Sequence, residues 1–524
     1  MAATFDVVVI GSGAGGGVVA QRLAHAGKKV LILERGEHLP REAENWSPKA
    51  VFIERRYRTQ ERWIDKDGRP FTPNTHYWVG GNTTFYGAAL MRLRKRDFED
   101  VQHQDGLSPA WPISLADLAP YYDEAERMWE VHGTRGDDPT ENGDEPPYAF
   151  PAIENDPGIA ALKSHWEKQS WRPFSLPLGV RVDAAHPVTS LCIKCKTCGG
   201  YPCLLKAKSD ARTLAIEPIM DMPNVTLLTG RKVLRLETDP SGRTITEVVC
   251  ETANGEERWT GDLVVLAAGA ANTAAVLLAS NNAAHPNGLA NGSDQVGRNY
   301  MFHTSTAMVS VTASHQEVTF PKTLAVNDFY WGDPSGGFGY PMGHIQMLEF
   351  MSGQTLEGQV SDWCPPALLP DFMSNALAAR MISMLVITED LPRQENRVRL
   401  GADGGIHLDY TFSNLTAHNR LVDTLKASLD GFVDHAHPIS QHHVQLDSLL
   451  PLYGTAHQCG TTRFGKDPKS SVLDPWCKAH EVDNLYVTDT SFFVSSAAVN
   501  PSLTLIANAL RVGDHLIERL NGSA

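Results

Sequence analysis

A glycine-rich turn between a buried strand and a helix near the N-terminus leaves this chain few possible folds. Residues 5–10 form a continuous apolar run, which is typical of a strand covered on both faces. Gly11, Gly13 and Gly16 follow with the spacing GxGxxG, and residues 18–26 then have helical spacing. A second buried strand over 29–33 leads directly to Glu34. The pattern predicts a β–turn–α–β unit with a right-handed parallel crossover.

These residue types suit the binding of a dinucleotide. Gly11 permits a tight turn, Gly13 lets the backbone approach a pyrophosphate, and Gly16 lets the helix pack closely on the strand. The helix N-terminus, beginning near Ala14, offers free N–H groups and partial positive charge to the phosphates. Glu34 can accept hydrogen bonds from both ribose hydroxyls and disfavours a 2′-phosphate, so an NADP site is not expected. We include the adjacent Arg35 in the predicted cofactor site.

A second junction of the same kind occurs far along the chain and favours an extended FAD fold over a compact NAD domain. A buried strand over 263–266 meets Ala267, Ala268 and Gly269 before a helical run over 272–279. We expect further strands of the same layer at 225–228, 233–236, 245–250 and 485–487, and a long amphipathic helix over 501–520.

These segments predict an α/β protein with a discontinuous Rossmann-like FAD-binding domain over 1–110, 205–300 and 456–524. Val233 is included in its cofactor site. Residues 301–455 are predicted to form a substrate-binding domain on an antiparallel sheet, with strands at 304–311 and 381–388. The segment 111–204 is expected to pack near that domain.

Charge and hydropathy exclude several kinds of partner. The net charge is −15, and the longest basic run is the RLRKR of residues 92–96. Such an acidic surface repels nucleic acid and anionic membranes, so a small neutral substrate fits better. No apolar run reaches the roughly 18–20 residues needed to span a bilayer. The N-terminus has no basic region or cleavage site, so we expect a cytoplasmic protein, with export alongside a partner subunit left open.

Four of the eight cysteines lie close together, at the spacing CxxCxxCx₄C. Three thiolates at CxxCxxC spacing resemble iron–sulfur ligation, although the last gap differs from that pattern. Thiolates also hold structural zinc. A loop of free thiols or a local disulfide is the third interpretation, and all three stay open. The four residues are Cys192, Cys195, Cys198 and Cys203.

Several spaced motifs carry a resemblance to a known family. The run 79–84, VGGNTT, is similar to a glycine-rich flavin loop, and 111–113 and 296–299 add further matches. The C-terminal part is the most specific: HQCGT at 457–461, NLYVTD at 484–489 and NPSLT at 500–504 occur in order. Over nearly its whole length the chain resembles the glucose–methanol–choline (GMC) oxidoreductase family.

The resemblance implies roles for particular residues. His457 is the expected catalytic base, and Asn500 the expected second group on the substrate oxygen, as in the pyranose oxidase and cholesterol oxidase branches. Members that tether FAD covalently carry a histidine about where Phe85 stands, so non-covalent FAD is implied. The further flavin neighbours implied are Gly80, Gly81, Asn82, Asp489, Pro501 and Thr504.

The chemistry agrees with these roles, because alcohol oxidation removes a proton from the hydroxyl and a hydride from its carbon. Histidine, with an ordinary pKa of about 6.5, is a suitable proton acceptor near neutral pH. The Asn500 amide can donate a hydrogen bond to the developing alkoxide. We leave His442 and His443 as surface or loop residues.

The expected enzyme converts a CH–OH group into a carbonyl and passes electrons to O₂, a quinone or a redox protein. A sugar, a glycoside or another small alcohol is the expected substrate. Alternatives are an aromatic primary alcohol oxidase, a lyase on the same fold, or an electron-transfer subunit with a redundant site. The aromatic side chains that either line the substrate pocket or fill the core are Phe329, Tyr330, Trp331, Phe338 and Tyr340.

Overall fold

The computed structural model describes residues 5–312, 318–350, 352–355, 371–432, 448–454 and 456–522. Within these ranges the predicted α/β fold is confirmed, with one parallel sheet and several antiparallel ones. His442 and His443 lie outside the described residues. No helix of the described chain is both long enough and apolar enough to cross a membrane.

The predicted βαβ unit belongs to a five-stranded parallel sheet in the order β11-β2-β1-β15-β23. Its strands come from both ends and the middle of the chain, as the sequence predicts. The central strands are buried on both faces, which explains their continuous runs of valine, isoleucine and leucine. The strands are β1 (Phe5–Ile10), β2 (Val30–Leu33), β11 (Val225–Leu228), β15 (Gly261–Leu266) and β23 (Leu485–Val487).

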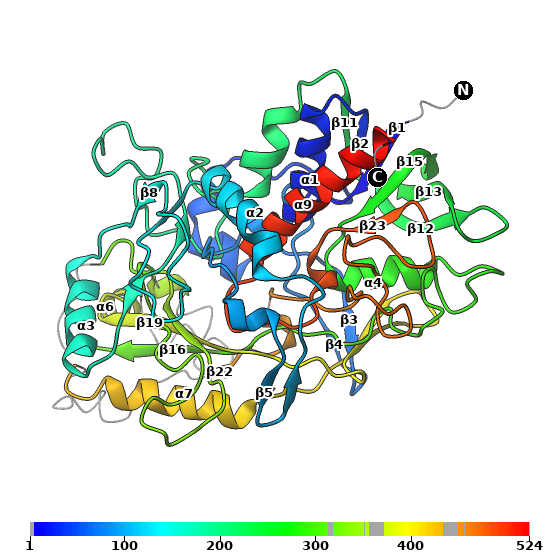
Figure 1. Ribbon diagram of the computed structural model, residues 1–524. Helices are drawn as coiled ribbons and strands as arrows, with labels where there is room; N and C mark the ends of the chain where they lie inside the picture. Colours follow the sequence, from blue (N-terminus) through cyan, green and yellow to red (C-terminus); the bar gives the residue numbers. More distant parts are fainter. Residues whose placement is uncertain are drawn as a thin grey trace.

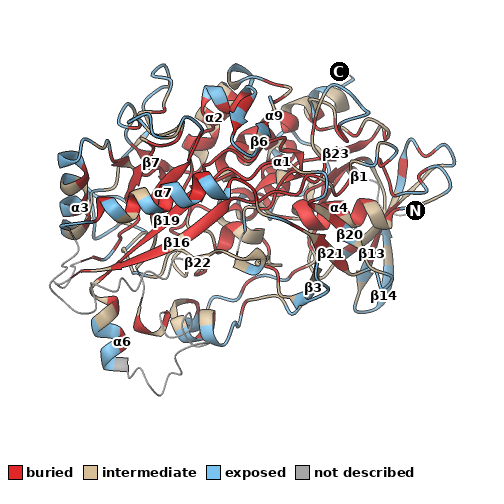
Figure 2. Cartoon of the chain, turned by 90° about the horizontal axis from the view of Figure 1, so that it is seen from below, coloured by how far each residue is buried: buried red, intermediate tan, exposed pale blue. Residues whose placement is uncertain are grey.

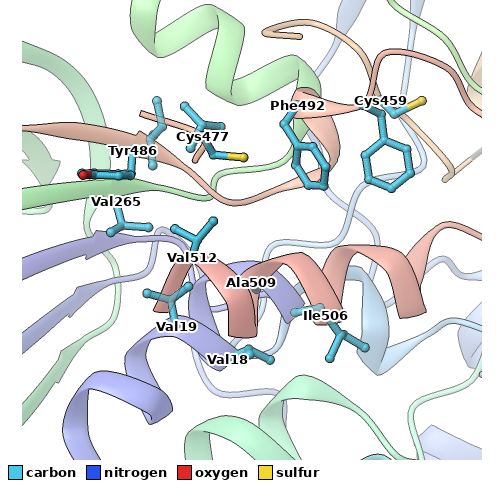
Figure 3. Close-up of a cluster of buried hydrophobic side chains, with 14 of the residues drawn as sticks. Val18, Val19, Val265, Cys459, Cys477, Tyr486, Phe492, Ile506, Ala509 and Val512 are labelled. Carbon is cyan, nitrogen blue, oxygen red and sulfur yellow. The ribbon is translucent and has the colours of Figure 1, made fainter. Parts of the chain in front are cut away.

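Helices α1 (Ala14–His25) and α9 (Ser502–Leu520) pack against each other beside this sheet (Figure 1). Figure 3 shows Val19 of α1 and Val512 of α9 on the side of the helices that faces Val265, on the strands above them. α2 (Leu115–Met128) covers the outer side of α9 and begins with a capping box. The first and last segments of the chain therefore share one core.

Two predicted strands belong to a different sheet from the one expected. Segments 233–236 and 245–250 were predicted in the parallel layer, but they lie in β12 (Lys232–Thr238) and β13 (Ile245–Thr252). With β14 (Gly255–Trp259) these strands form a separate antiparallel sheet. The connections between consecutive strands are too short for the crossover that parallel pairing requires. Each of the three strands has exposed and partly buried residues, whereas β1 and β2 are almost entirely buried.

The middle of the chain forms the predicted antiparallel sheet, in the order β22-β16-β19-β18-β17-β9. β16 and β19 have the predicted bounds, and α7 (Leu415–Ser428) packs on them with its exposed side outward (Figure 2). β19 is buried throughout, so both faces of the sheet are covered there. The strands are β9 (Phe174–Ser175), β16 (Thr304–Val311), β17 (Leu324–Val326), β18 (His344–Met347), β19 (Met381–Thr388) and β22 (Ser448–Leu449).

A smaller sheet joins segments that the sequence assigned to different domains. Strands β3 (Trp63–Asp65) and β4 (Pro70–Phe71) come from the N-terminal segment, and β20 (Arg397–Leu400) and β21 (Ile406–Asp409) from the middle block. β3 pairs with β21 in parallel. The division into domains stays a prediction.

The other elements surround these sheets. They include five short strands, in two small sheets, and three α-helices. These strands and helices are β5 (Val101–His103), β6 (Gly106–Ser108), β7 (Val131–Gly133), β8 (Phe150–Pro151), β10 (Leu178–Gly179), α3 (Pro157–Lys168), α4 (Ala270–Ala279) and α6 (Asp371–Ala378).

Candidate functional site

A cavity of about 950 Å³ opens at the carboxyl ends of the parallel strands. Gly11, Glu34, Ala268 and Asp489 follow β1, β2, β15 and β23 along the chain, and all four line the cavity. Ligands of open parallel sheets bind at this edge, because the turns that follow the strands meet there. The position and size of the cavity suit a large cofactor together with a small substrate.

The glycines of the first turn have separate roles in the structure. A Cβ atom built at Gly13 meets nothing within 4 Å, so it would project into open space. A Cβ at Gly16 would lie 2.1 Å from the Gly11 carbonyl oxygen, so only glycine lets α1 start this close to β1. Gly13 therefore keeps the cavity open, whereas Gly16 serves helix packing.

Glu34 ties the first turn to a second loop. Its Oε2 accepts hydrogen bonds from the Ser12 backbone N–H at 3.0 Å and from Ser12 Oγ at 2.6 Å. Its Oε1 accepts from the Gly36 N–H at 2.8 Å, and Ser12 Oγ also accepts from the Gly80 N–H at 3.1 Å. Burial raises the pKa of the Glu34 carboxyl, while these donors oppose the shift. A carboxylate has about four acceptor positions, which leaves capacity for a ligand hydroxyl.

Asp489 organises the second glycine junction in a similar way. Its carboxylate accepts from the backbone N–H groups of Gly269 and Ser491, each at 2.9 Å, and from Thr273 Oγ1. Gly269 has a φ of +88°, and a Cβ there would meet nothing within 4 Å. Burial raises the pKa of Asp489, and the donors around it oppose that shift. Both glycine junctions thus present open backbone to the cavity.

His457 is a partly exposed residue of the cavity wall and forms a pair with a second histidine. Its Nδ1 lies 2.8 Å from Nδ1 of His303, and Nε2 of His303 lies 3.1 Å from the Ser496 carbonyl oxygen. Burial, and then the neighbouring His303, lower the pKa of His457 to about 3. Burial also lowers the pKa of His303 to about 4. Both rings are therefore neutral near pH 7, and His457 Nε2 bonds to no described residue.

Asn500 faces the same cavity with unused hydrogen-bonding capacity. Its Oδ1 is buried and has no hydrogen-bond partner among the described residues. Buried polar atoms are rarely left unpaired, so such an atom beside a cavity indicates a missing ligand. Pro501, the residue before α9, lines the cavity beside it.

A further cavity residue, His76, stacks on Phe85 with ring centroids 4.0 Å apart. Its backbone N–H donates to Asn82 Oδ1 at 2.8 Å, which fixes the glycine-rich loop. Burial lowers the pKa of His76 to about 3, so this ring is uncharged as well.

Most of the predicted cofactor residues come together on the cavity wall, but three do not. Gly16 packs against Gly11, Gly80 packs against Arg212, and Thr504 Oγ1 lies 2.7 Å from the Tyr122 hydroxyl. These three support the wall from behind. The predicted residues that line the cavity are Gly11, Gly13, Ala14, Glu34, Arg35, Gly81, Asn82, Val233, Ala268, Gly269, Asp489 and Pro501, with His457 and Asn500.

Three residues of the site, Ser12, His76 and His303, were not predicted from the sequence. Ser12 lies inside the glycine motif, and His303 follows the 296–299 run by only four residues, so proximity to a motif was the available signal. No sequence signal marked His76, because its contacts with Phe85 and Asn82 depend on how the loop folds.

The metal alternatives for the cysteine segment are not supported. Within the described ranges no group of three or more histidine, cysteine, aspartate or glutamate residues is arranged to hold a metal ion. The four cysteines considered as ligands are free thiols: Cys192, Cys195, Cys198 and Cys203.

The aromatic residues expected either in a pocket or in the core are absent from the cavity wall. Phe329 and Tyr330 are buried in the core, and Tyr340 is exposed. Trp331 and Phe338 pack partly buried against the core. The rings that do line the cavity include Tyr77, Phe85 and Tyr86.

The cavity fits the predicted dinucleotide cofactor. Backbone at Gly13 and Gly269 is open where phosphates would approach, and Glu34 has capacity for a ribose hydroxyl. The two predicted catalytic side chains lie on the wall of the same cavity.

Comparison with known proteins agrees with this geometry. Two models of the GMC oxidoreductase family match residues 5–305 and 413–509. The 6'''-hydroxyparomomycin C oxidase of Streptomyces lividus is 32% identical over 98% of this chain and 92% of its own length. The paromamine 6'-oxidase of Streptomyces fradiae is 31% identical over 97% and 90%. The crystal structure of pyridoxine 4-oxidase from Mesorbium loti has a similar fold, with a TM-score of 0.66 at 17% identity over 98% of this chain and 99% of that one.

Proposed function

The chain belongs to the GMC oxidoreductase family, and we propose that it oxidises an alcohol of a sugar or glycoside to a carbonyl. In this reaction His457 is the base, and Asn500 is the second polar group that contacts the substrate oxygen. Members of the family are FAD-dependent enzymes that act on CH–OH groups, and this chain is such an enzyme. The observation that carries the proposed roles is that both side chains face one cavity with unused hydrogen-bonding atoms.

His457 accepts the hydroxyl proton of the substrate. Its Nδ1 is held by His303, so Nε2 is the nitrogen left for the substrate. Because the lowered pKa keeps the ring neutral near pH 7, the acceptor is present before the alcohol arrives. A correctly placed general base contributes typically about 10²–10⁴-fold to a rate.

Asn500 orients the substrate oxygen. Its amide donates a hydrogen bond as negative charge grows on that oxygen, and it cannot take the proton itself. Bound FAD supplies the hydride acceptor. Phe85, at the expected position of a tethering histidine, carries no group that bonds to a flavin, which favours non-covalent FAD.

The substrate class rests on two kinds of support. The two relatives that are more than 30% identical to this chain are oxidases named for paromamine and hydroxyparomomycin C. The part of the cavity near His457 also has polar groups that suit a hydroxylated ligand, including Asn74, Thr75 and Gln458. The word oxidase in both names favours O₂ as the electron acceptor.

The test is an anaerobic screen of alcohols on the purified FAD-loaded protein, followed by flavin absorbance. Sugars and glycosides with free hydroxyls are expected to bleach the flavin, and admission of O₂ is expected to restore its colour. Bleaching by simple aromatic alcohols alone contradicts the substrate class. Absence of bleaching by any alcohol contradicts the reaction.

A further inference from the structure

We propose that His303 is a positioning residue that fixes the tautomer of His457, so that Nδ1 of His457 carries the proton and Nε2 faces the cavity as a free lone pair. The proposal rests on the proposed role of His457 as the base. It assigns a role to a buried histidine that does not line the cavity.

The contacts of His303 place it between two segments of the site. It precedes β16 directly and is only 1% exposed. One ring nitrogen lies 2.8 Å from Nδ1 of His457, and the other lies 3.1 Å from the carbonyl oxygen of Ser496, in the segment that leads to Asn500. The two rings meet edge to face, with centroids 4.9 Å apart and planes inclined at 79°.

These two contacts determine where the protons are. A carbonyl oxygen only accepts hydrogen bonds, so Nε2 of His303 must carry a hydrogen. In a neutral ring the other nitrogen, Nδ1, then has a lone pair. A lone pair on His303 Nδ1 requires that Nδ1 of His457 be the donor across the 2.8 Å contact. The remaining nitrogen of His457, Nε2, is left without a proton.

The opposite arrangement is unfavourable. If Nδ1 of His303 donated to His457, the neutral His303 ring would present a lone pair to the Ser496 oxygen at 3.1 Å. Protonation of both nitrogens of His303 would remove that conflict, but a buried ring disfavours charge. Among the titratable groups, Glu389 raises the pKa of His303 and is itself paired with His103, while His303 in turn lowers the pKa values of His344 and His457.

The arrangement also supports His457 after it has taken the proton. The His457 imidazolium carries hydrogens on both nitrogens, and Nδ1 continues to donate to His303. A hydrogen bond from a charged donor is roughly twice as strong as a neutral one. His303 therefore accepts the same hydrogen bond from Nδ1 of His457 before and after proton transfer, and so holds the ring in one orientation throughout.

Two amide substitutions of His303 test whether it acts by accepting a hydrogen bond from His457 or only by filling space in the core. In His303→Asn the side-chain oxygen takes the place of Nδ1, so it can still accept from His457. In His303→Gln the amide nitrogen takes the place of Nε2, so it can still donate to Ser496 but offers His457 no acceptor at the Nδ1 position. Each variant keeps one of the two contacts and loses the other.

The matched control is His418→Gln. His418 is another buried histidine of the same region, and its two ring nitrogens bond to Thr306 and Thr388 on β16 and β19. It does not line the cavity, so its replacement tests the effect of losing a buried imidazole from this sheet.

We expect anaerobic flavin reduction by substrate to fall about 100-fold in His303→Gln and less than about 10-fold in His303→Asn, within the range of general-base effects. The His418→Gln rate should stay at the wild-type value. The substrate concentration that gives half the maximal rate should change little, because the substrate does not contact His303. Equal losses in the two His303 variants would overturn the proposal.

A direct readout does not depend on turnover. Nitrogen NMR of ¹⁵N-histidine-labelled protein shows which ring nitrogen is protonated, and the His457 signals are assigned by their loss in His457→Ala. A proton on Nδ1 of His457 in wild type is expected, and a proton on Nε2 refutes the proposal. If no alcohol reduces the wild-type flavin, the proposed function fails, while the NMR result still decides the tautomer.

Discussion

The replacement of Gly13 by alanine is expected to have opposite effects on the folded apoprotein and on cofactor binding. Gly13 has φ −66° and ψ −170°, angles that alanine also adopts, and its added Cβ would meet nothing within 4 Å. The substitution therefore costs the fold nothing in contacts. It also reduces the conformational freedom of the unfolded chain, which stabilises a protein by about 0.4–1 kcal/mol.

The same methyl group projects into the space where the backbone is predicted to meet the pyrophosphate of FAD. Forcing an extra methyl group into a well-packed contact costs about 1–3 kcal/mol. At about 1.4 kcal/mol per factor of ten, FAD should bind about 5- to 150-fold more weakly. Gly16→Ala is the contrasting variant, because its Cβ would lie 2.1 Å from the Gly11 oxygen and should destabilise the apoprotein itself.

Two assays measure these effects separately. Urea unfolding of the apoprotein gives the free energy of unfolding, and titration with FAD, followed by the quenching of its fluorescence, gives the dissociation constant. The expected result is that Gly13→Ala is at least as stable as wild type and binds FAD more weakly. Wild-type affinity for FAD in this variant would refute the placement of the pyrophosphate at Gly13.

Three further predictions concern the base, its pH response and the cysteines. His457→Ala should lower the rate of anaerobic flavin reduction by about 10²–10⁴-fold while FAD still binds, and stopped-flow absorbance measures this. Because the pKa of His457 is lowered to about 3, its neutral form predominates down to that pH, so the flavin reduction rate should not fall between pH 8 and pH 5; a decline centred near pH 6.5 contradicts this. Replacement of the four clustered cysteines by serine should leave flavin reduction unchanged, because no metal-binding group is found among the described residues; loss of a bound metal together with activity contradicts this.

The sequence was most informative where one local pattern determined the backbone. The strand bounds at 225–228, 304–311, 381–388 and 485–487 agree with the structure, because short runs of apolar and β-branched residues leave little freedom. The placement of β12 and β13 could not be predicted in this way. A strand's apolar pattern indicates that it packs on a core, but it does not specify which sheet it joins.

The site shows the same limit. Gly11 and Glu34 could be predicted because each follows a strand of the parallel sheet, where ligands bind, and Asp489 because its motif resembles one of the GMC family. His303 could not be assigned a role, because its contacts with His457 and Ser496 join positions far apart in sequence. The cysteine segment shows the opposite case, in which a clear sequence pattern has no matching metal site among the residues that the structure describes. Ligand-like spacing does not by itself bring the thiols together around an ion.

The most direct test of the account is a crystal structure of the FAD-loaded protein. We expect the pyrophosphate at the Gly11–Gly13 turn and the isoalloxazine ring in the part of the cavity lined by His457 and Asn500. A ring bound elsewhere, or one that leaves no space for an alcohol in reach of both side chains, would contradict the proposed chemistry.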